Sequence, residues 1–460
     1  MEESIDIAMT QLGEAIARYH KLLESDPFKN LDWAKELQEK MNAANLKEGG
    51  RLICPFLRPH FLSGRQYTSL VKAAESLSSA IDRMKQMVLA SPALLGRLQL
   101  LPAEKMLAAI DPGYQYLAVT SLLDTHLNGG TLQFVSYDAD TAPGVAYGGA
   151  LADLFYECAP VKQFRKQYSL TKLGGAKHLV ASLLATFKQF GGKRKPRIGV
   201  MEFRQAFQSA EPSDYLILRE LFRAQGLEAE IVAPDQLEYK GGVLRQGGFV
   251  IDMILRRVKV HEFLLRFDLS HPLVRAYRDR AVCVVNSFRA ELAHKRALFA
   301  LLTDEALTAN FPIAEKKAVQ QHIPWTRVVA PGMTKHEEQL VDLMEFILKN
   351  RQNLVLKPND DSGEEHTVQG WTTDDARWER ALKLATRTPH VVQQRVDPVK
   401  AVFPLLRYGD LEMRELQVDV HPHTYLGKVQ GCSSWISETS TGSFSSIAGL
   451  APTYILEPKP

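Results

Sequence analysis

The chain has 460 residues, 45% of them hydrophobic and 24% charged, which is the composition of an ordinary globular protein and predicts more than one domain. The net charge of +3 is small for this length, which argues against a nucleic-acid or membrane-surface partner. No apolar run is long enough to span a membrane, and the acidic stretch 1–6 lacks the apolar core of a signal peptide. The basic run 193–197 follows two glycines and precedes an apolar run, so we expect a solvated loop.

The cysteines are scattered along the chain. Cys54, Cys158, Cys283 and Cys432 form no CxxC pair, so neither a disulfide framework nor a thiolate zinc site is indicated. This pattern fits a reducing compartment, and we expect a cytoplasmic protein.

The first 110 residues predict helices. Apolar residues recur at helical spacing from Ile7 to Leu22 and from Leu70 to Met84. Between these runs, the two prolines of segment 52–61 favour extended or turning backbone. His60 lies in that segment, and we expect it to be packed and hydrogen-bonded.

A hairpin is predicted next. The run Tyr116–Leu123 is apolar and rich in β-formers, residues 128–130 have the sequence of a turn, and Thr131–Tyr137 reads as a second strand. An acidic loop, 138–144, follows, and a helix should begin near Gly149.

Residues 170–290 alternate between helix and strand, which is typical of a mostly parallel sheet with covering helices. We expect helices at Lys172–Phe190 and Asp214–Gln225. The expected strands are Arg197–Met201, Glu228–Val232, Phe249–Leu255 and Ala281–Val285, with a small hairpin turning at Gly241-Gly242.

A further α/β unit is predicted over residues 288–395. We expect helices at Ala290–Leu302, at Lys335–Lys349 and from Asp374, the last capped by Thr372 or Thr373. A short strand covers 391–394. The tail from Leu411 is rich in β-formers, and it includes the Ser/Thr/Gly-rich segment 437–446.

The stretch 353–363 carries the clearest chemical signal. A short apolar strand, Leu354–Leu356, leads into Lys357, then Pro358 and a polar loop that includes Ser362 and Gly363. A lysine at a rigid strand end, beside loop N–H groups, can bind a phosphate.

Three other features accompany Lys357 in chain order. Lys295 lies on the helix expected to open the unit, Gln393 and Gln394 end it, and Arg414 begins the last predicted sheet. This order resembles the ATP-grasp superfamily, and the early stretch from Asp124 to Asp138 makes it similar to the circularly permuted, glutathionylspermidine synthase-like members. The resemblance covers residues 115 to 450.

The resemblance implies a mixed α/β fold with an ATP-grasp-like core in circularly permuted order and a helical N-terminal region. It divides the chain into that region (1–110), a first part of the core sheet with the acidic hairpin (111–170), a Rossmann-like domain (171–288), a lid-like domain (289–396) and a second part of the core sheet (397–460).

The resemblance also implies roles for particular residues. ATP would contact Lys295, Lys357, Gln393, Gln394, Ser362 and Gly363, Mg²⁺ would bind Asp124 and Asp138, and Lys357 and Arg414 would act in catalysis. The implied activity is an ATP-dependent carboxylate–amine ligase that acts through an acyl phosphate on small-molecule substrates.

The sequence departs from the family pattern at several positions. Leu122 stands where the family has an arginine, and Ser136 replaces a metal-binding glutamate. Asp138 replaces an asparagine and keeps an oxygen ligand. The loop after Asp360 has one glycine, and Glu364 and Glu365 would repel a triphosphate unless Mg²⁺ or a lysine intervenes.

Structural alternatives stay open for these residues. The alternative for Asp124 is a strand-end polar residue, and the alternative for Asp138 and Asp140 is that they make Asx turns. The alternative for Lys295 is a solvated helix lysine, and for Gln393 and Gln394 it is that they are plain strand residues. Arg414 would instead pair with Glu412 or Glu415. His421 and His423 flank a proline, and we expect a turn there.

Two functions therefore remain in view: the ligase, and a non-catalytic relative that binds nucleotide or a partner. The departures at Leu122 and Ser136 favour the second.

Overall fold

The largest sheet of the protein is mixed and contains strands from both the early and the late parts of the chain. The computed structural model describes residues 2–128, 130–141, 145–203, 213–360, 366–438 and 447–459. The strand order is β3-β23-β22-β21-β4-β5, with β20 paired to β21 and β6 to β23, and only β3 runs parallel to its partner β23 among the described pairs of this sheet. Its strands are β3 (His60–Ser63), β4 (Thr120–Asn128), β5 (Thr131–Asp138), β6 (Tyr168–Lys172), β20 (Val399–Arg407), β21 (Asp410–Tyr425), β22 (Lys428–Ser437) and β23 (Ala448–Pro458).

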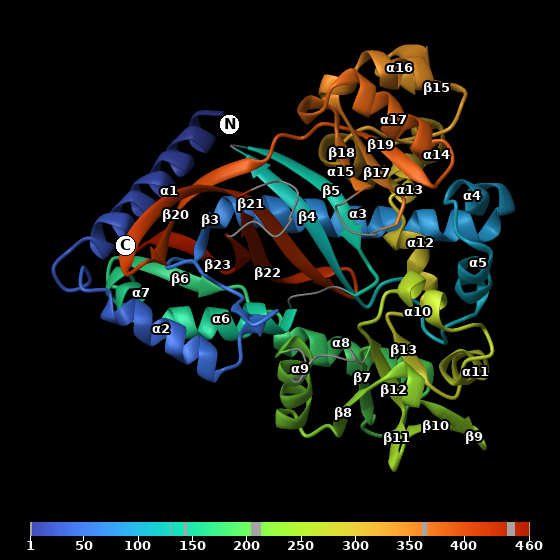
Figure 1. The fold of residues 1–460 in the computed structure, drawn as a ribbon, viewed down its shortest axis with the longest axis horizontal. Coiled ribbons are helices and arrows are strands. Elements are labelled where there is room, and N and C mark those ends of the chain that lie inside the picture. The colour runs from blue at the N-terminus through green and yellow to red at the C-terminus, as the bar shows by residue number, and fades with distance from the viewer. Residues whose placement is uncertain are drawn as a thin grey trace.

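The early hairpin and the late strands lie side by side in this sheet (Figure 1). Strand β4 pairs with β5 and, on its other edge, with β21, where Thr125 lies opposite Val420 and Leu122 opposite His423. The expectation that the Asp124 hairpin and the Arg414 strand share one sheet is therefore confirmed.

The helices of residues 2–164 include those that cover the large sheet. They are α1 (Glu2–Leu23), α2 (Asp32–Ala43), α3 (Gly64–Ala90), α4 (Pro92–Arg97), α5 (Pro102–Ala109), α6 (Val145–Glu157) and α7 (Ala159–Phe164), and the short strands β1 (Lys47–Glu48) and β2 (Arg51–Leu52) pair between α2 and β3. Helix α3 packs its buried apolar side, which includes Leu70, Leu77 and Met84, toward β21, β22 and β23. Across the described ranges, no helix is both long and apolar enough to cross a membrane.

The start of α3 has a clear local cause. The hydroxyl of Ser63 accepts a hydrogen bond from the backbone N–H of Gln66, and the Gln66 side chain accepts one from the backbone N–H of Ser63. This reciprocal capping satisfies two N–H groups that would otherwise lack partners at the helix end. The extended backbone expected before it is confirmed by β2 and β3.

The alternating segment forms a parallel sheet, as expected. The strand order is β13-β12-β7-β8, and all three pairings among these described strands are parallel. The elements are β7 (Ile198–Met201), β8 (Ala229–Val232), β12 (Met253–Arg256), β13 (Cys283–Val285), α8 (Ala176–Phe190), α9 (Ser213–Ala224), α10 (Val260–Arg266) and α11 (Pro272–Arg278). A small antiparallel sheet of β9 (Glu238–Lys240), β10 (Val243–Gln246) and β11 (Phe249–Ile251) is attached to it, and Gly241 and Gly242 turn between β9 and β10 with positive φ.

Two helix starts in this region differ from expectation, and the single strand expected over Phe249–Leu255 is instead two strands, β11 and β12, in different sheets. Residue 172 does not open α8, because Lys172 pairs with Tyr454 in the large sheet as the last residue of β6, so the helix begins at Ala176. The helix expected near Gly149 begins earlier, at Val145.

An antiparallel sheet, β14-β19-β17-β18, lies beside the hairpin end of the large sheet (Figure 1). Its strands are β14 (Thr326–Val328), β17 (Leu354–Pro358), β18 (Val368–Gln369) and β19 (His390–Gln394), accompanied by α12 (Glu291–His294), α13 (Ala297–Leu302), α14 (Glu305–Thr308), α15 (Ile313–His322), α16 (Leu343–Lys349), α17 (Asp375–Ala385) and the hairpin of β15 (Met333–His336) and β16 (Gln339–Asp342). The strands predicted around Leu354–Leu356 and Val391–Gln394 are confirmed by β17 and β19.

Helices α16 and α17 of this unit begin differently from what the sequence predicted. The helix expected over Lys335–Lys349 is half hairpin, and α16 starts only after Asp342, whose carboxylate accepts from the Glu345 N–H. The N-cap of α17 is Asp374, which accepts from the Arg377 N–H, rather than Thr372 or Thr373.

The helix expected over Ala290–Leu302 is broken at Lys295. The backbone N–H of Arg296 donates to Asn359 O, and that of Ala297 donates to the side chain of Asn359, which lies 62 residues beyond Ala297 in the chain. The Arg296 guanidinium also binds the carbonyls of Pro358 and Asp360. These bonds divert the backbone and hold Lys295 in an extended conformation beside the end of β17.

Candidate functional site

Lys357 connects the smaller antiparallel sheet to the acidic hairpin. Its Nζ donates to Gln393 Oε1 at 2.7 Å, across the β17–β19 pair, and to the backbone oxygen of Val135 in β5 at 3.4 Å. Gln393 is 3% exposed, and its Nε2 donates to Thr326 Oγ1 at 3.1 Å. Two residues predicted from separate motifs, Lys357 and Gln393, therefore meet at the hairpin that carries Asp124 and Asp138.

The predicted metal ligands lie on one face of that hairpin. Asp124 lies directly opposite Ser136 in the neighbouring strand, and Asp138 is two residues beyond Ser136. Side chains at i and i+2 of a strand share a face of the sheet, as do those of directly opposite residues, so Asp124 and Asp138 lie on the same face. Both are carboxylates, and Mg²⁺ prefers oxygen ligands and keeps several of its waters. The donor set therefore fits Mg²⁺.

Asp124 is held ionised by Ser136 and His421, whose contacts with it the sequence did not predict. The Ser136 hydroxyl donates to one of its oxygens, and His421 Nε2 lies 3.1 Å from the other. Burial acts to raise the pKa of Asp124, but the His421 hydrogen bond and charge outweigh it and lower the pKa to about 2. The same pairing raises the pKa of His421 against the opposing effect of burial. The turn expected at His421 and His423 is absent from β21, which continues through both.

Asp138 accepts hydrogen bonds from the acidic loop that follows it. The backbone N–H groups of Asp140 and Thr141 donate to its Oδ1 at 2.8 and 3.2 Å, which is the Asx-turn alternative. His294 Nδ1 lies 3.6 Å from the same oxygen. Burial acts to raise the pKa of Asp138, but these neighbours, His294 above all, hold it well below its usual range.

Lys295 is a buried lysine surrounded by carboxylates, and its 3% exposure rules out the alternative of a solvated helix lysine. Its Nζ lies 2.9 Å from Glu104 Oε1 and 3.0 Å from Glu291 Oε1, and it donates to Asp360. Burial alone would lower the pKa of Lys295, but the surrounding carboxylates raise it, so the ammonium is retained.

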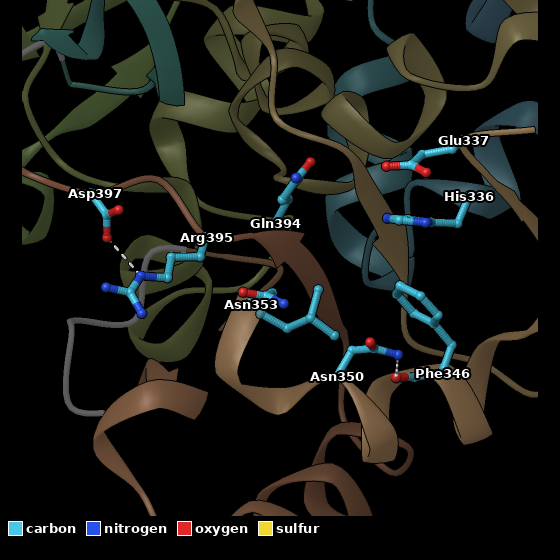
Figure 2. A pocket seen from close by; sticks show the side chains of 9 residues that line it. His336, Glu337, Phe346, Asn350, Asn353, Gln394, Arg395 and Asp397 are labelled. Carbon is cyan, nitrogen blue, oxygen red and sulfur yellow. Dashed lines mark hydrogen bonds and ion pairs between the residues drawn. The ribbon is translucent and has the colours of Figure 1, made fainter.

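Gln394 does not lie in this cluster. Gln394 is exposed, and since neighbouring strand residues point to opposite faces it does not share the Gln393 environment. It lines a pocket of about 470 Å³ with Asn353, Arg395 and Asp397, seen in Figure 2. Ser362 and Gly363 lie outside the described residues.

Arg414 is not brought to this cluster. It lies in β21 seven residues before His421, which corresponds to about 23 Å of strand. Its guanidinium pairs with Glu412, as the structural alternative predicted, and its side chain is 43% exposed.

Several residues of the cluster were missed by sequence analysis. His294 is next to Lys295, and Asp360 lies in the stretch 353–363 that was expected to bind phosphate. Both therefore lie beside residues that the sequence had already singled out. Glu104 lies 191 residues before Lys295 and had no such neighbour.

Comparison with known proteins supports the fold. No family model matches the sequence, and no curated protein matches it. Among solved structures, a glutathione synthetase-like effector from Globodera pallida, determined in apo form, has a TM-score of 0.55 at 11% identity, covering 94% of this chain and 98% of that chain. A putative gamma-glutamylcysteine synthetase from Methylobacillus flagellatus has a TM-score of 0.40 at 12% identity, covering 84% and 86%, which is too low to carry an argument.

The first of these likenesses extends over nearly all of both chains. The protein therefore has a mixed α/β fold similar to that of a glutathione synthetase-like protein.

Proposed function

We propose that this protein is an ATP-dependent ligase that joins a carboxylate to an amine, with Mg²⁺ as cofactor. The observation that carries the proposal is the position of Lys357. Its ammonium extends from β17 to the backbone of β5, within the hairpin that carries Asp124 and Asp138 on one face. A cation from one sheet thus contacts the backbone of the hairpin whose face carries the two carboxylates, and we propose that a metal-bound phosphate is held between them.

In the proposed reaction the substrate carboxylate attacks the γ-phosphorus of ATP, the bond from that phosphorus to the ADP oxygen breaks, and an acyl phosphate forms. An amine then attacks the acyl carbon, phosphate leaves with the bonding electron pair, and the amine loses a proton. Mg²⁺, when bound, would neutralise phosphate charge.

The chain's own residues position and neutralise charge. The Lys357 ammonium would stabilise the negative charge on the transferred phosphoryl oxygens. Gln393 accepts a hydrogen bond from Lys357 and is itself held by Thr326, so it fixes where the ammonium lies. Asp124 and Asp138 remain ionised because their histidine partners favour the charged form, which is the form a metal requires.

The test is ADP release from ATP in the presence of pooled amino acids, polyamines and small peptides. If the protein is a ligase, ADP should be released only when both a carboxylate and an amine are present. Lys357→Met should slow it by roughly a hundredfold or more, because a transition-state charge contact is lost. Lys400→Met, at an exposed lysine of β20, is the matched control and should leave release unchanged.

A second candidate function is a non-catalytic relative that binds nucleotide or another anion. It is favoured by the ion pairs that occupy Lys295, since an ammonium held by Glu104, Glu291 and Asp360 is not directed at a phosphate. This candidate predicts binding of a nucleotide without amine-dependent ADP release in the same panel. Release that depends on an amine would exclude it.

A further inference from the structure

Helix α12 and the loop after β17 bring an imidazole and two carboxylates together. Glu291 and His294 are three residues apart, on one face of α12, and Asp360 follows the end of β17. One ligand atom from each of these side chains lies within 4.8 Å of the other two. His294 Nε2 is 3.3 Å from Asp360 Oδ1.

Glu291 and His294 are buried and Asp360 is half-buried, and several polar atoms of the three side chains make no hydrogen bond. Glu291 is 1% exposed and His294 6% exposed. Within the described part of the chain, neither oxygen of Glu291, neither ring nitrogen of His294 and not Oδ1 of Asp360 makes a hydrogen bond, although Glu291 Oε1 lies 3.0 Å from Lys295 Nζ and His294 Nε2 lies 3.3 Å from Asp360 Oδ1. Buried polar atoms without hydrogen bonds are costly, and a bound ion is one of the few arrangements that satisfies several at once.

The charge in this cluster is unbalanced. Counting only described residues in ion-pair contact, the cluster holds four carboxylates, Lys295 and two histidines, His294 and His261; the carboxylates are those of Glu104, Glu291, Asp360 and Asp138. The cluster therefore has room for additional positive charge.

We propose that Glu291, His294 and Asp360 form a binding site for a zinc-like divalent transition metal ion. An imidazole nitrogen with two carboxylate oxygens suits such an ion better than Mg²⁺, which prefers oxygen ligands alone. Zinc bonds of about 2.1 Å would draw the three atoms to about 3.4 Å from one another, a shift that side-chain rotation can provide.

Lys295 is the competitor at this site. Its ammonium already contacts Glu291 and Asp360, so a metal ion must replace it there. Lys295 can keep its contact with Glu104, which is also anchored by the Leu101 N–H and is not one of the proposed ligands. The metal ion and the ammonium thus compete for the same two carboxylates.

The inference goes beyond the proposed ligase and does not depend on it. The proposed Mg²⁺ ligands are Asp124 and Asp138, and nucleotide is needed to test them. The metal ion proposed here binds without nucleotide, so failure of one proposal leaves the other standing.

The test is titration of chelator-stripped protein with Zn²⁺ by calorimetry, followed by the visible spectrum of the Co²⁺-loaded protein. We expect one Zn²⁺ ion per chain to bind at Glu291, His294 and Asp360. The visible spectrum of the Co²⁺-loaded protein should show d–d absorption bands. Glu291→Gln and His294→Gln should each weaken binding at least about tenfold. His126→Gln, at a histidine paired with Asp419 outside the cluster, is the control and should leave binding unchanged.

Lys295→Met supplies a result that misfolding cannot imitate. Removing the competing ammonium should tighten Zn²⁺ binding about tenfold or more. No Zn²⁺ binding by the wild-type protein, binding only by Lys295→Met, or binding that survives in both Glu291→Gln and His294→Gln would each overturn the proposal.

Discussion

His60 shows how a single buried residue makes stability depend on pH. Its Nδ1 is 2.8 Å from Ser434 Oγ, and burial, aided by the charge of Arg58, lowers its pKa to about 3. The unfolded chain has a histidine pKa of about 6.5. Between these values the unfolded state binds more protons, so stability is lost as pH falls from about 6.5 toward 3.

His60→Gln tests this coupling. From pH 7 to pH 5 the wild-type protein should lose about 1–2 kcal/mol more unfolding free energy than the variant, because the variant has no imidazole to protonate. Urea denaturation at both pH values measures the difference. Equal losses in the two proteins would show that His60 is protonated as readily in the folded state as in the unfolded one.

Arg414 provides a second test at the residue scale. Its ion pair with Glu412 is partly exposed, and such pairs contribute up to about 1 kcal/mol. We expect Arg414→Gln to change the unfolding free energy by no more than that and to leave any ADP release intact, because the guanidinium is far along β21 from Asp124. A hundredfold loss of release with a normal melting temperature would restore Arg414 to the active site.

At the residue scale, local sequence patterns predicted where Lys357 and Gln393 lie, in β17 and β19, and the roles of both stay predictions. Lys357 was identified because strand, lysine, proline and polar loop are consecutive, and Gln393 because it ends the neighbouring strand. Glu104 and His421 were missed because their partners, Lys295 and Asp124, are brought to them only by folding.

At the scale of elements, the side chain of Asn286 joins the parallel sheet to the hairpin. Its Oδ1 accepts from the N–H groups of Val119 and Thr120 at 2.8 and 3.1 Å, and its Nδ2 donates to the carbonyls of Thr120 and Ala139, both at 2.7 Å. The residue is 2% exposed. This amide therefore fixes where the Asp138 hairpin lies relative to the end of β13.

Asn286→Ala should lower the unfolding free energy by about 3 kcal/mol, since it leaves several buried backbone groups without partners, at about 1–3 kcal/mol each. Chemical denaturation measures the loss, with Asn42→Ala, at an exposed position of α2, as control. A loss below about 1 kcal/mol would mean that water or a shifted backbone replaces the amide.

Errors in element prediction have identifiable causes. The helix expected at Lys335–Lys349 fails because tertiary contacts stabilise a hairpin there, with the Trp325 indole donating to Lys335 O at 3.0 Å. The break at Lys295 arises from hydrogen bonds to Asn359, a residue distant in sequence. Periodicity reports neither kind of contact.

At the scale of the whole molecule, the main result is the sheet that pairs β4 with β21. The sequence predicted this neighbourhood only through the order of motifs, because no local pattern links strands so far apart. Figure 1 shows the consequence: the hairpin lies between the late strands of the large sheet and the smaller sheet that carries Lys357.

This arrangement is the basis of the proposed phosphate site between the two sheets. Asp124 and Asp138 come from one sheet and Lys357 from the other, so nucleotide binding should require both a metal ion and the lysine. Mg²⁺ is needed because the carboxylates alone would repel a triphosphate.

The most direct measurement is calorimetric titration with a non-hydrolysable ATP analogue, with and without Mg²⁺, on the wild type, Lys357→Met and Lys400→Met. We predict weak, saturable binding that requires Mg²⁺, weakens at least about tenfold in Lys357→Met without a change in melting temperature, and is unaffected in Lys400→Met. Absence of binding at millimolar analogue, or equal binding by Lys357→Met and the wild type, would contradict the proposed site.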